Sequence, residues 1–416
     1  MSSKTALVIG GGIIGAASAW HLQRAGFSTT IVDPGDPTKA ASFGNAGHLA
    51  TEQIEPLPSI KTLLSLPRRL FVAGGPVALP PRDIGTWLPF GLRLIAASIP
   101  ARFEAGAHAL KSLITRALPA WHRLAGDVGA PDLIREHGHF CVWETPATAA
   151  AGQQALRGVD LGYASVRDST TEELALLRAR LSGRPVGAVR FSNTGQVVDI
   201  PALRARIADV FRAAGGTNRT GSVVQLAIDS GRARAVFVDG VALDADRIIV
   251  ASGIGSHGLL RGIDGPVPLI AERGYHIDAA IDVGEWPHDL PPVAFGDRSV
   301  IVTRFAKSLR MTGFTEFSQV SSPYDPRKWT RLERHADELG LPKGPGRTRW
   351  IGPRPTLPDY LPAIGRSRAA GNLFYAFGHQ HLGMTLAAIT GELIAALASE
   401  TPPSVPLAPF DLKRFG

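Results

Sequence analysis

His379 and His381 stand two residues apart in YAFGHQHLGMT (375–385), an otherwise apolar segment with glycines at 378 and 383. Two neighbouring histidines could bind a metal ion, whereas flanking glycines let the backbone approach a flat or charged ligand closely. No Asp, Glu or Cys lies at ligand spacing from this pair, and the sequence contains no H-E-x-x-H or C-x-x-C motif. We therefore predict no metal site and interpret the segment as a turn against a ligand.

The other end of the chain indicates which ligand this is, because Gly10, Gly12 and Gly15 form the motif G-x-G-x-x-G. The motif follows a short apolar strand and opens a predicted helix, and Asp33 comes 18 residues after Gly15. Gly10 suits a tight turn, Gly12 lets the backbone approach a pyrophosphate, and Gly15 permits close helix–strand packing. The helix N-terminus supplies amides to the phosphates, and Asp33 can accept a hydrogen bond from a ribose hydroxyl. These features predict a dinucleotide site.

Three later segments favour FAD over a nicotinamide cofactor. KAASFGNAGHLATEQ (39–53) is rich in small residues that let the chain run along an extended cofactor, and ADRIIVASGIGSHGL (245–259) is a buried strand ending in another close-approach turn. In 372–399 a strand and a glycine turn precede a helix that begins near Met384. A helix N-terminus at a ring carbonyl would stabilise the negative charge of a reduced flavin.

These four segments, in this order and spacing, resemble the FAD-dependent D-amino-acid oxidase superfamily, which also includes glycine and sarcosine oxidases. The resemblance runs along essentially the whole chain, with 195–217 as a linking strand and helix and 222–252 as a small β unit. The chain is most similar to bacterial D-amino-acid dehydrogenases and their D-hydroxyproline dehydrogenase relatives in GNAGHLATEQIEPL, ERGYHI and RPTLPDYLPAIG. The long 60–125 insertion also looks dehydrogenase-like.

The motif and the resemblance together define the residues expected to bind FAD. Polar contacts are expected from Ser42 and Asn45, and room for the ring from Ala46, Gly47, Gly378 and Gly383. The full set is Gly10, Gly12, Ile13, Ile14, Gly15, Asp33, Ser42, Asn45, Ala46, Gly47, His48, Val224, Ala251, Ser252, Gly253, Gly378, His379, His381, Gly383, Met384 and Thr385.

The resemblance implies that hydride leaves a substrate Cα for flavin N5, so the protein must hold the substrate carboxylate and orient Cα. Arg354 is expected to bind that carboxylate, because the family's substrate arginine falls in the matching Arg-Pro motif and a guanidinium fork fits a carboxylate. Tyr275 and His276 are candidate pocket residues, although strand alternation places them on opposite faces. His48 is expected near the ring, where it could contact substrate or anchor the flavin covalently.

The same segments predict an α/β fold of two domains, a Rossmann-like FAD-binding domain and a substrate domain built on an antiparallel sheet. The FAD-binding domain is expected to be discontinuous and to comprise 1–60, 195–262 and 350–416. The substrate domain is expected to comprise 61–194 and 263–349, with a helical insertion at about 60–125. A chain of 416 residues is long enough to build two cores.

Composition narrows the partners and the compartment. The net charge is +8, but the arginines are scattered and no basic run is interleaved with aromatics, so we expect no nucleic-acid partner. The single Cys141 and the absence of a visible leader favour the cytoplasm. No apolar run is expected to span a bilayer.

The segment 84–100 is expected either to pack as a helix on its own domain or to lie on the inner face of the cell membrane. The side chains expected to insert there are Trp87, Leu88, Phe90 and Leu92.

The leading functional hypothesis is a dehydrogenase that oxidises a D-amino acid or a proline-like amino acid such as cis-4-hydroxy-D-proline and passes electrons to a respiratory acceptor. One alternative is an oxygen-dependent oxidase of the glycine or sarcosine type that produces hydrogen peroxide. Another is a flavin subunit of an electron-transfer complex without its own substrate site, against which the Arg354 motif argues. The oligomeric state is left open.

Overall fold

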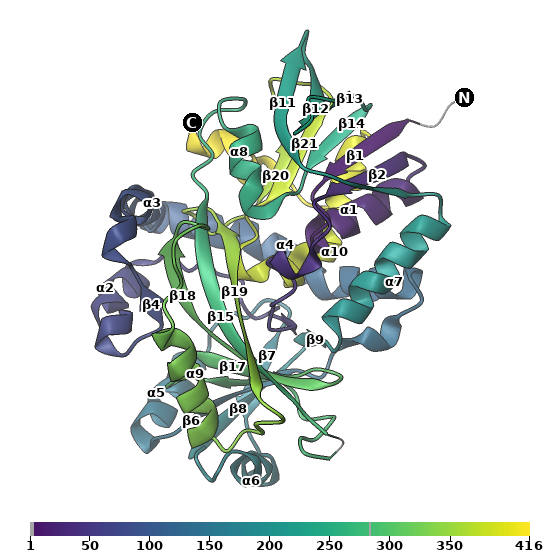
Figure 1. The fold of residues 1–416 in the computed structure, drawn as a ribbon. Coiled ribbons are helices and arrows are strands. Elements are labelled where there is room, and N and C mark those ends of the chain that lie inside the picture. Colours follow the sequence, from purple (N-terminus) through teal and green to yellow (C-terminus); the bar gives the residue numbers. More distant parts are fainter. Residues whose placement is uncertain (1–3, 283) are drawn as a thin grey trace.

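The computed structural model describes residues 4–282 and 284–416, which form two sheet-based layers that meet across a cavity (Figure 1). The N-terminal strand and the last long helix lie together in one layer, although almost the whole chain separates them. The other layer holds a large twisted sheet. This arrangement confirms the predicted α/β fold of two domains.

The first layer contains a six-stranded sheet in the described chain, parallel except at its last pair. Its strands are short apolar runs such as ALVI in β1 and RIIV in β14, as expected for strands covered by helices on both faces. Parallel pairing brings the carboxyl ends of β1 and β14 side by side, with Ile9 opposite Val250. The sheet order is β10 (Thr217–Thr220), β2 (Ser28–Asp33), β1 (Thr5–Ile9), β14 (Arg247–Val250), β21 (Leu373–Phe377) and β20 (Ala363–Arg366).

One apolar core joins this sheet to helices from distant parts of the chain. Trp121 of α4 is fully buried in that core, and its Nε1 donates to the carbonyl oxygens of Met384, at 2.8 Å, and Thr385. The second half of the 60–125 segment therefore packs in the first layer, although the sequence predicted it in the other domain. The helices of this core are α1 (Ile13–Arg24), α4 (Pro100–Asp127), α7 (Ile200–Ala213) and α10 (Gly383–Ala398).

The segment Gln380–Ala398 corrects one expectation, because it is apolar and long enough to cross a membrane. Two thirds of its most apolar stretch, 67%, is buried inside the protein. We interpret it as the central helix of the core, since a helix apolar all round is typical of either setting. The helices Pro81–Ala97 and Pro100–Asp127 also qualify together, but they meet at a bend of 89°.

The second layer contains a nine-stranded sheet in the described chain that is largely antiparallel, with parallel pairs β16–β6 and β4–β18. The predicted domain boundary at 350 falls inside β19, which pairs with β15 in this sheet. Helices α5 (Pro146–Leu156), α6 (Thr171–Arg180) and α9 (Arg327–Glu338) accompany it. The path runs β19 (Arg347–Thr356), β15 (Ile270–Ala280), β18 (Ser308–Ser318), β17 (Val300–Arg304), β16 (Val293–Phe295), β6 (His139–Trp143), β8 (Gly187–Ser192) and β7 (Ser165–Asp168), with β4 (Val77–Ala78) beside β18.

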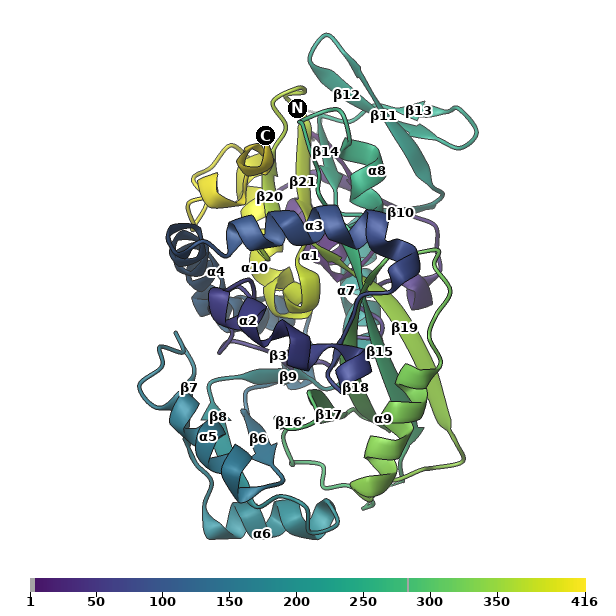
Figure 2. The same cartoon turned by 90° about the vertical axis from the view of Figure 1, so that its left-hand side faces the viewer.

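Smaller elements complete the fold. The β unit expected over 222–252 is present as three antiparallel strands, β11 (Val223–Asp229), β12 (Arg232–Phe237) and β13 (Ala242–Leu243). A second small sheet joins segments of both layers: β3 (His48–Leu49), β9 (Gly195–Val197) and β5 (Ile134–Arg135). Two helices, α2 (Ile60–Arg69) and α3 (Ile84–Ala97), lie on one face of the molecule (Figure 2), and the short α8 (Ser256–Leu260) follows β14.

Candidate active site

A cavity of about 860 Å³ lies at the carboxyl ends of β1 and β14 and continues between the two layers. Its walls come from the β1–α1 turn, the 39–53 segment, the turn after β14, the large sheet and the β21–α10 turn. Most residues predicted to contact cofactor or substrate line it. The predicted residues that do not line it are Gly15, Gly47, His276, Gly378 and Thr385.

The glycines of the first turn have three different surroundings. Gly10 has φ +109°, and a Cβ there would stand 2.6 Å from the Ala251 carbonyl oxygen. A Cβ at Gly15 would stand 1.8 Å from the Gly10 carbonyl oxygen, so this glycine serves helix–strand packing. A Cβ at Gly12 would meet no atom within 4 Å, which leaves the cavity side of the turn open. An open backbone at a helix N-terminus is what a pyrophosphate requires.

Asp33 lies at the end of β2 and holds this turn in place. Its Oδ2 accepts from the Gly11 amide at 2.7 Å, and its Oδ1 accepts from the Gly35 amide at 2.9 Å. Arg204 of α7 donates from Nη2 to the Gly11 carbonyl at 3.0 Å, and burial lowers the pKa of this guanidinium while Asp33 raises it. The sequence did not single out Arg204, because one arginine in an amphipathic helix carries no motif.

The 39–53 segment runs along the cavity as expected, but its glycine has another role. Asn45 Oδ1 accepts from the Gly47 amide at 2.7 Å and so forms a local turn. Gly47 has φ +72°, and a Cβ there would stand 2.7 Å from the Phe305 ring. Ser42 lines the cavity with a buried hydroxyl that has no hydrogen-bond partner among the described residues.

The β21–α10 turn separates the two histidines. His379 Nε2 lies 3.0 Å from Thr390 Oγ1 inside the core, and burial lowers the pKa of His379 to about 3. His381 is bonded to the Gln53 side chain and lies at the junction of the main cavity with a smaller outer one of about 350 Å³. Burial lowers its pKa to about 4.

Two residues of this turn differ from their expected roles. A Cβ at Gly378 would stand 2.6 Å from Leu357 Cδ1, so this glycine, with φ +78°, makes room for a leucine rather than for a ring. Thr385 is buried, and its Oγ1 accepts from the Ala50 amide at 3.0 Å, which ties the 39–53 segment to α10. Gly383 and Met384, at the start of α10, do line the cavity.

Arg354 lies on β19 directly opposite Glu272 on β15. Its Nη1 donates to Glu272 Oε1 at 3.2 Å, and its side chain is 21% exposed, at the junction of the two cavities. Glu272 is buried and also accepts from the hydroxyls of Thr356, at 2.9 Å, and Tyr360, at 3.1 Å. Gly274 leaves space for the guanidinium, because a Cβ there would stand 2.3 Å from Arg354 Nη2.

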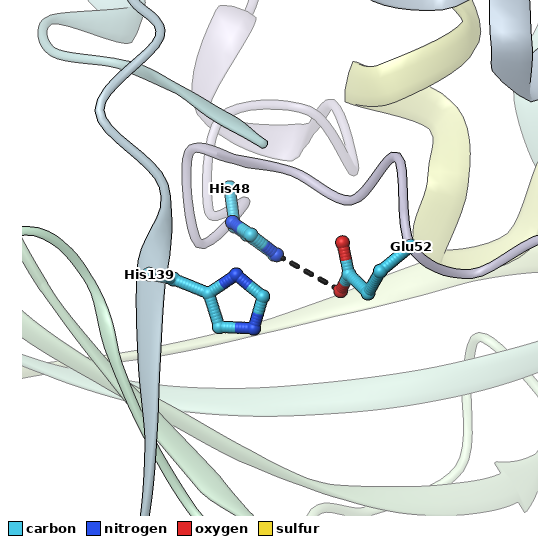
Figure 3. A group of neighbouring side chains, drawn as sticks. All are labelled: His48, Glu52 and His139. Carbon is cyan, nitrogen blue, oxygen red and sulfur yellow. Dashed lines mark hydrogen bonds and ion pairs between the residues drawn. The ribbon is translucent and has the colours of Figure 1, made fainter. Parts of the chain in front are cut away.

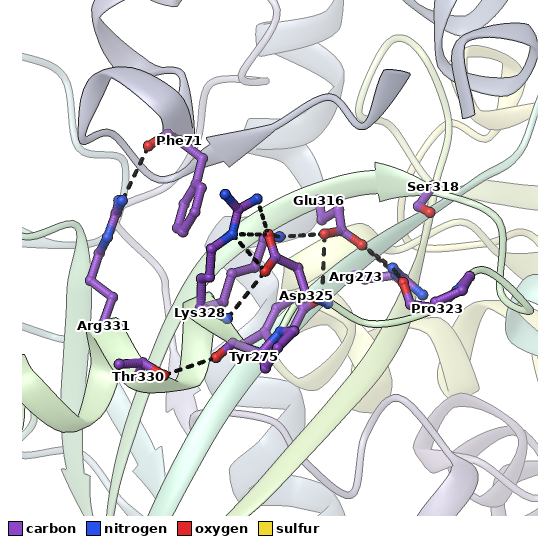
Figure 4. A network of polar contacts seen from close by, with 12 residues as sticks. Phe71, Arg273, Tyr275, Glu316, Ser318, Pro323, Asp325, Lys328, Thr330 and Arg331 are labelled. Atoms are coloured by element: carbon purple, nitrogen blue, oxygen red, sulfur yellow. Dashed lines mark hydrogen bonds and ion pairs between the residues drawn. The ribbon is translucent and has the colours of Figure 1, made fainter. Parts of the chain in front are cut away.

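Tyr275 and His276 lie on opposite sides of β15, as strand alternation predicts. Tyr275 lines the cavity, but its hydroxyl lies 3.3 Å from Glu316 Oε2 in a buried network with Arg273 and Lys328 (Figure 4). Burial and the Glu316 charge raise the pKa of this phenol. The hydroxyl is therefore engaged in the core, where it steadies the Glu316 network.

His276 lies away from the cavity. Its ring stacks on Trp350 with centroids 5.0 Å apart, and Nδ1 lies 3.1 Å from the Gly44 carbonyl oxygen. Burial and then Arg310 lower the pKa of His276 to about 3, so it is neutral at physiological pH. It contacts the 39–53 segment through the Gly44 carbonyl and does not line the cavity.

His48 faces the cavity in a cluster that the sequence did not predict (Figure 3). Its Nε2 lies 3.1 Å from Glu52 Oε1, and its ring lies edge-on to His139 with centroids 4.6 Å apart. His139, on β6, is bonded through Nδ1 to Thr194 Oγ1 at 3.0 Å. One ligand-type atom from each of His48, Glu52 and His139 lies within 4.8 Å of the others, a spacing that a metal ion could also use.

With this geometry described, comparison with known proteins assigns the family. A family model described as FAD dependent oxidoreductase matches residues 5–397. The chain belongs to this family. FAD is therefore its cofactor.

The relatives of this oxidoreductase cover its full length. It is 31% identical, over 98% of both chains, to the D-amino-acid oxidase of Bradyrhizobium diazoefficiens. It is 28% identical, over 98% of its own chain and 99% of the relative, to D-amino acid dehydrogenase 2 of Ralstonia nicotianae. The glycine oxidase from Geobacillus kaustophilus shares its fold, with a TM-score of 0.72 and 21% identity over 100% of this chain and 99% of that one.

The residues present fit FAD. The unpartnered Ser42 hydroxyl and the open face of Gly12 offer polar and steric complementarity to a phosphate-bearing cofactor. The start of α10 has no side-chain cap, and Gly383 and Met384 at this end line the cavity, so free backbone amides there could donate to a carbonyl oxygen of the cofactor. When bound, FAD supplies a two-electron acceptor, and the protein supplies position and electrostatics.

Proposed function

We propose that this oxidoreductase oxidises an amino acid, either D-configured or proline-like such as cis-4-hydroxy-D-proline, at its Cα–N bond. The Cα hydrogen would leave with its electron pair, which bound FAD would accept, and the amine would release a proton to solvent to give an imine. Water then converts a primary imine to a 2-oxo acid and ammonia, or opens a cyclic imine. The names of the two relatives, a D-amino-acid oxidase and a D-amino acid dehydrogenase, support this substrate class.

The proposal rests on the hydrogen bonding of the Arg354 guanidinium. Only its Nη1 has a hydrogen bond, and it is to Glu272, within the described chain. Nε and Nη2 remain available as two parallel donors, which is the pattern that binds a carboxylate. Because Glu272 is itself held by Thr356 and Tyr360, the guanidinium is positioned before substrate arrives.

Anaerobic flavin bleaching tests this proposal. The purified holoenzyme is mixed without oxygen with D-amino acids, their L-enantiomers, cis-4-hydroxy-D-proline, sarcosine and glycine. We expect bleaching by at least one D-amino acid or cyclic amino acid. Bleaching by L-enantiomers alone, or by none of these compounds, would contradict the proposal.

For the electron acceptor, we favour a membrane component over oxygen, and the outer surface supports this choice. Nine of the exposed large apolar side chains fall in residues 57–99, on and around α2 and α3 (Figure 2). We call this surface the apolar face. It comprises Leu57, Ile60, Leu64, Val72, Ile84, Leu88, Leu92, Ile95 and Ile99, with Val72 88% and Leu64 79% exposed.

The charges around the apolar face suit an anionic bilayer. Basic side chains at Lys61, Arg68, Arg82, Arg93 and Arg102 are exposed there. The acidic residue within 57–102 is Asp83, which is buried and bonded to Ser318 and Ser322. Apolar side chains surrounded by cations are typical of segments that lie in the membrane interface.

The expected inserting residues are only partly those found on the apolar face. Leu88 and Leu92 are exposed, but Phe90 is buried and packs on Phe317 at 5.6 Å between ring centroids. Trp87 donates to the Pro80 carbonyl at 2.8 Å. The chain is helical through Pro89. The exposed apolar side chains therefore follow helical spacing, and the sequence alone did not show which of them face outward.

Vesicle binding and acceptor assays separate the alternatives. We expect the enzyme to sediment with phosphatidylglycerol vesicles. The double variant Leu64→Glu/Leu92→Glu should abolish this binding. The control Val238→Glu, at an exposed site outside the apolar face, should leave it unchanged. Dye or quinone reduction should outpace oxygen consumption. Rapid hydrogen peroxide production with no vesicle binding would instead favour the oxidase, consistent with the name of the Bradyrhizobium relative.

A further inference from the structure

Glu52 lies at the junction of the two cavities. It lines both the main cavity and the smaller outer cavity, and so does Arg354. Gln53, His381 and Thr315 also line both. The junction of the two cavities therefore carries the Arg354 guanidinium and the Glu52 carboxylate. These two groups do not bond each other, because Arg354 is paired with Glu272.

Only one oxygen of the Glu52 carboxylate has a hydrogen-bond partner among the described residues. Its side chain is 12% exposed, and His48 Nε2 lies 3.1 Å from Oε1. Its Oε2 has no hydrogen-bond partner among the described residues, and neither does His48 Nδ1. A carboxylate held out of water without a full set of donors is costly unless a ligand completes it.

Its surroundings keep Glu52 ionised at physiological pH. Burial raises the pKa of Glu52, but the attraction of His48 and His139 outweighs it and lowers the pKa to about 2. Glu272 is already paired to Arg354, so Glu52 is the carboxylate at the junction that still has an oxygen without a donor among the described residues.

We propose that Glu52 receives the ammonium group of the substrate while Arg354 holds its carboxylate. This subsite rests on the proposed function and deepens it: the ligand must carry a cationic amine beside its carboxylate. His48 is a positioning residue, since its Nε2 holds Oε1 and leaves Oε2 for the ligand. A primary or a cyclic secondary ammonium can each supply the N–H donor.

A pair of ligands of matched shape isolates the ammonium contact. D-Proline and cyclopentanecarboxylate differ only by the ring N–H group in place of a methylene. Each ligand is titrated into wild-type holoenzyme, Glu52→Gln and Glu55→Gln, and binding is followed by calorimetry and by flavin absorbance. Ligands that bleach the flavin are measured instead by anaerobic stopped-flow mixing. Glu55 is the control because it lines the outer cavity but is exposed.

Wild type is expected to bind D-proline more tightly than cyclopentanecarboxylate. Glu52→Gln should weaken D-proline about 10-fold to 100-fold, as for loss of a charge-assisted hydrogen bond, and leave cyclopentanecarboxylate within about threefold. Glu55→Gln should change neither. The same comparison with D-alanine and isobutyrate, in which a methyl group replaces the ammonium, covers primary amines.

Two results would overturn the subsite: equal wild-type affinities within each ligand pair, or equal weakening of both ligands in Glu52→Gln. Stoichiometric metal in the purified protein, lost in Glu52→Gln, would overturn it as well, because an ion would then occupy the carboxylate. If no amino acid bleaches the flavin, the proposed function fails, and the calorimetric comparison still decides whether Glu52 recognises an amine.

Discussion

Gly274→Ala tests whether Arg354 must sit where the structure places it. A Cβ at 274 would stand 2.3 Å from Arg354 Nη2 and 2.6 Å from its Cζ, whereas ordinary contacts begin near 3.4 Å. We expect the guanidinium to move by about 1 Å, because it is the end of a long side chain whereas Gly274 is paired with Gly352 of β19. A displacement of about 1 Å at a positioning group costs on the order of 100-fold in rate.

The assay for Gly274→Ala is anaerobic stopped-flow reduction, which gives the substrate dissociation constant and the limiting reduction rate separately. We expect full FAD content, a 10-fold to 100-fold lower reduction efficiency, and the same melting temperature within a few degrees. Arg354→Ala should lose more, about 100-fold or beyond, because two charge-assisted hydrogen bonds disappear.

The double variant Gly274→Ala/Arg354→Ala provides the control. If the methyl group acts only through Arg354, adding it to Arg354→Ala changes nothing further, and the two effects are strongly non-additive. Wild-type kinetics in Gly274→Ala would refute the reasoning. So would simple multiplication of the two losses, because Gly274 would then act by another route.

Three further predictions follow from the fold and the cavity. Gly12→Val should purify folded but without FAD, as judged by the ratio of 450 nm to 280 nm absorbance, because its side chain would fill open cavity. Gly15→Val should instead fail to fold, since its Cβ meets the Gly10 carbonyl; a yellow Gly12→Val protein would contradict the assignment. Thr385→Val should cost about 1–3 kcal/mol in urea unfolding by leaving the buried Ala50 amide unpaired, and no loss would show that this bond is dispensable. His276 has a folded pKa of about 3 against 6.5 unfolded, so the unfolded chain binds the extra proton and stability falls as pH drops from about 6.5 toward 3. His276→Asn should flatten this fall by about 1.4 kcal/mol per pH unit, which urea melts at pH 7, 6 and 5 would measure against the exposed control His108→Asn.

The glycine motif and the cofactor followed from the sequence because they depend on local geometry. The strand–turn–helix at Gly10 to Gly15 and the turn after Val250 are local in sequence, so their residue types reveal their shape. The same logic failed at Gly47 and Gly378, where the glycine accommodates Phe305 and Leu357 from distant parts of the chain. A glycine shows that space is needed, but not what fills it.

The polar residues at the junction could not be predicted from their local sequence. Glu272 precedes Tyr275 by three residues in a strand, and only the pairing of β15 with β19 places it against Arg354. His139 reaches His48 from a strand about 90 residues away. Glu52 lies in the segment GNAGHLATEQIEPL. Its spacing of four residues from His48 is the signal that could have identified it as a site residue.

The position of α10 has a consequence for how the protein is made. The strand β1 needs β14 as its neighbour, and α1 and α4 pack on α10, which ends at residue 398 of 416. The first layer can therefore not acquire its native packing until α10 has left the ribosome. At roughly 5–20 residues per second, the apolar faces of α1 and α4 wait for tens of seconds of synthesis. During that interval we expect the nascent chain to depend on chaperones, and FAD capture to be a late, post-translational event.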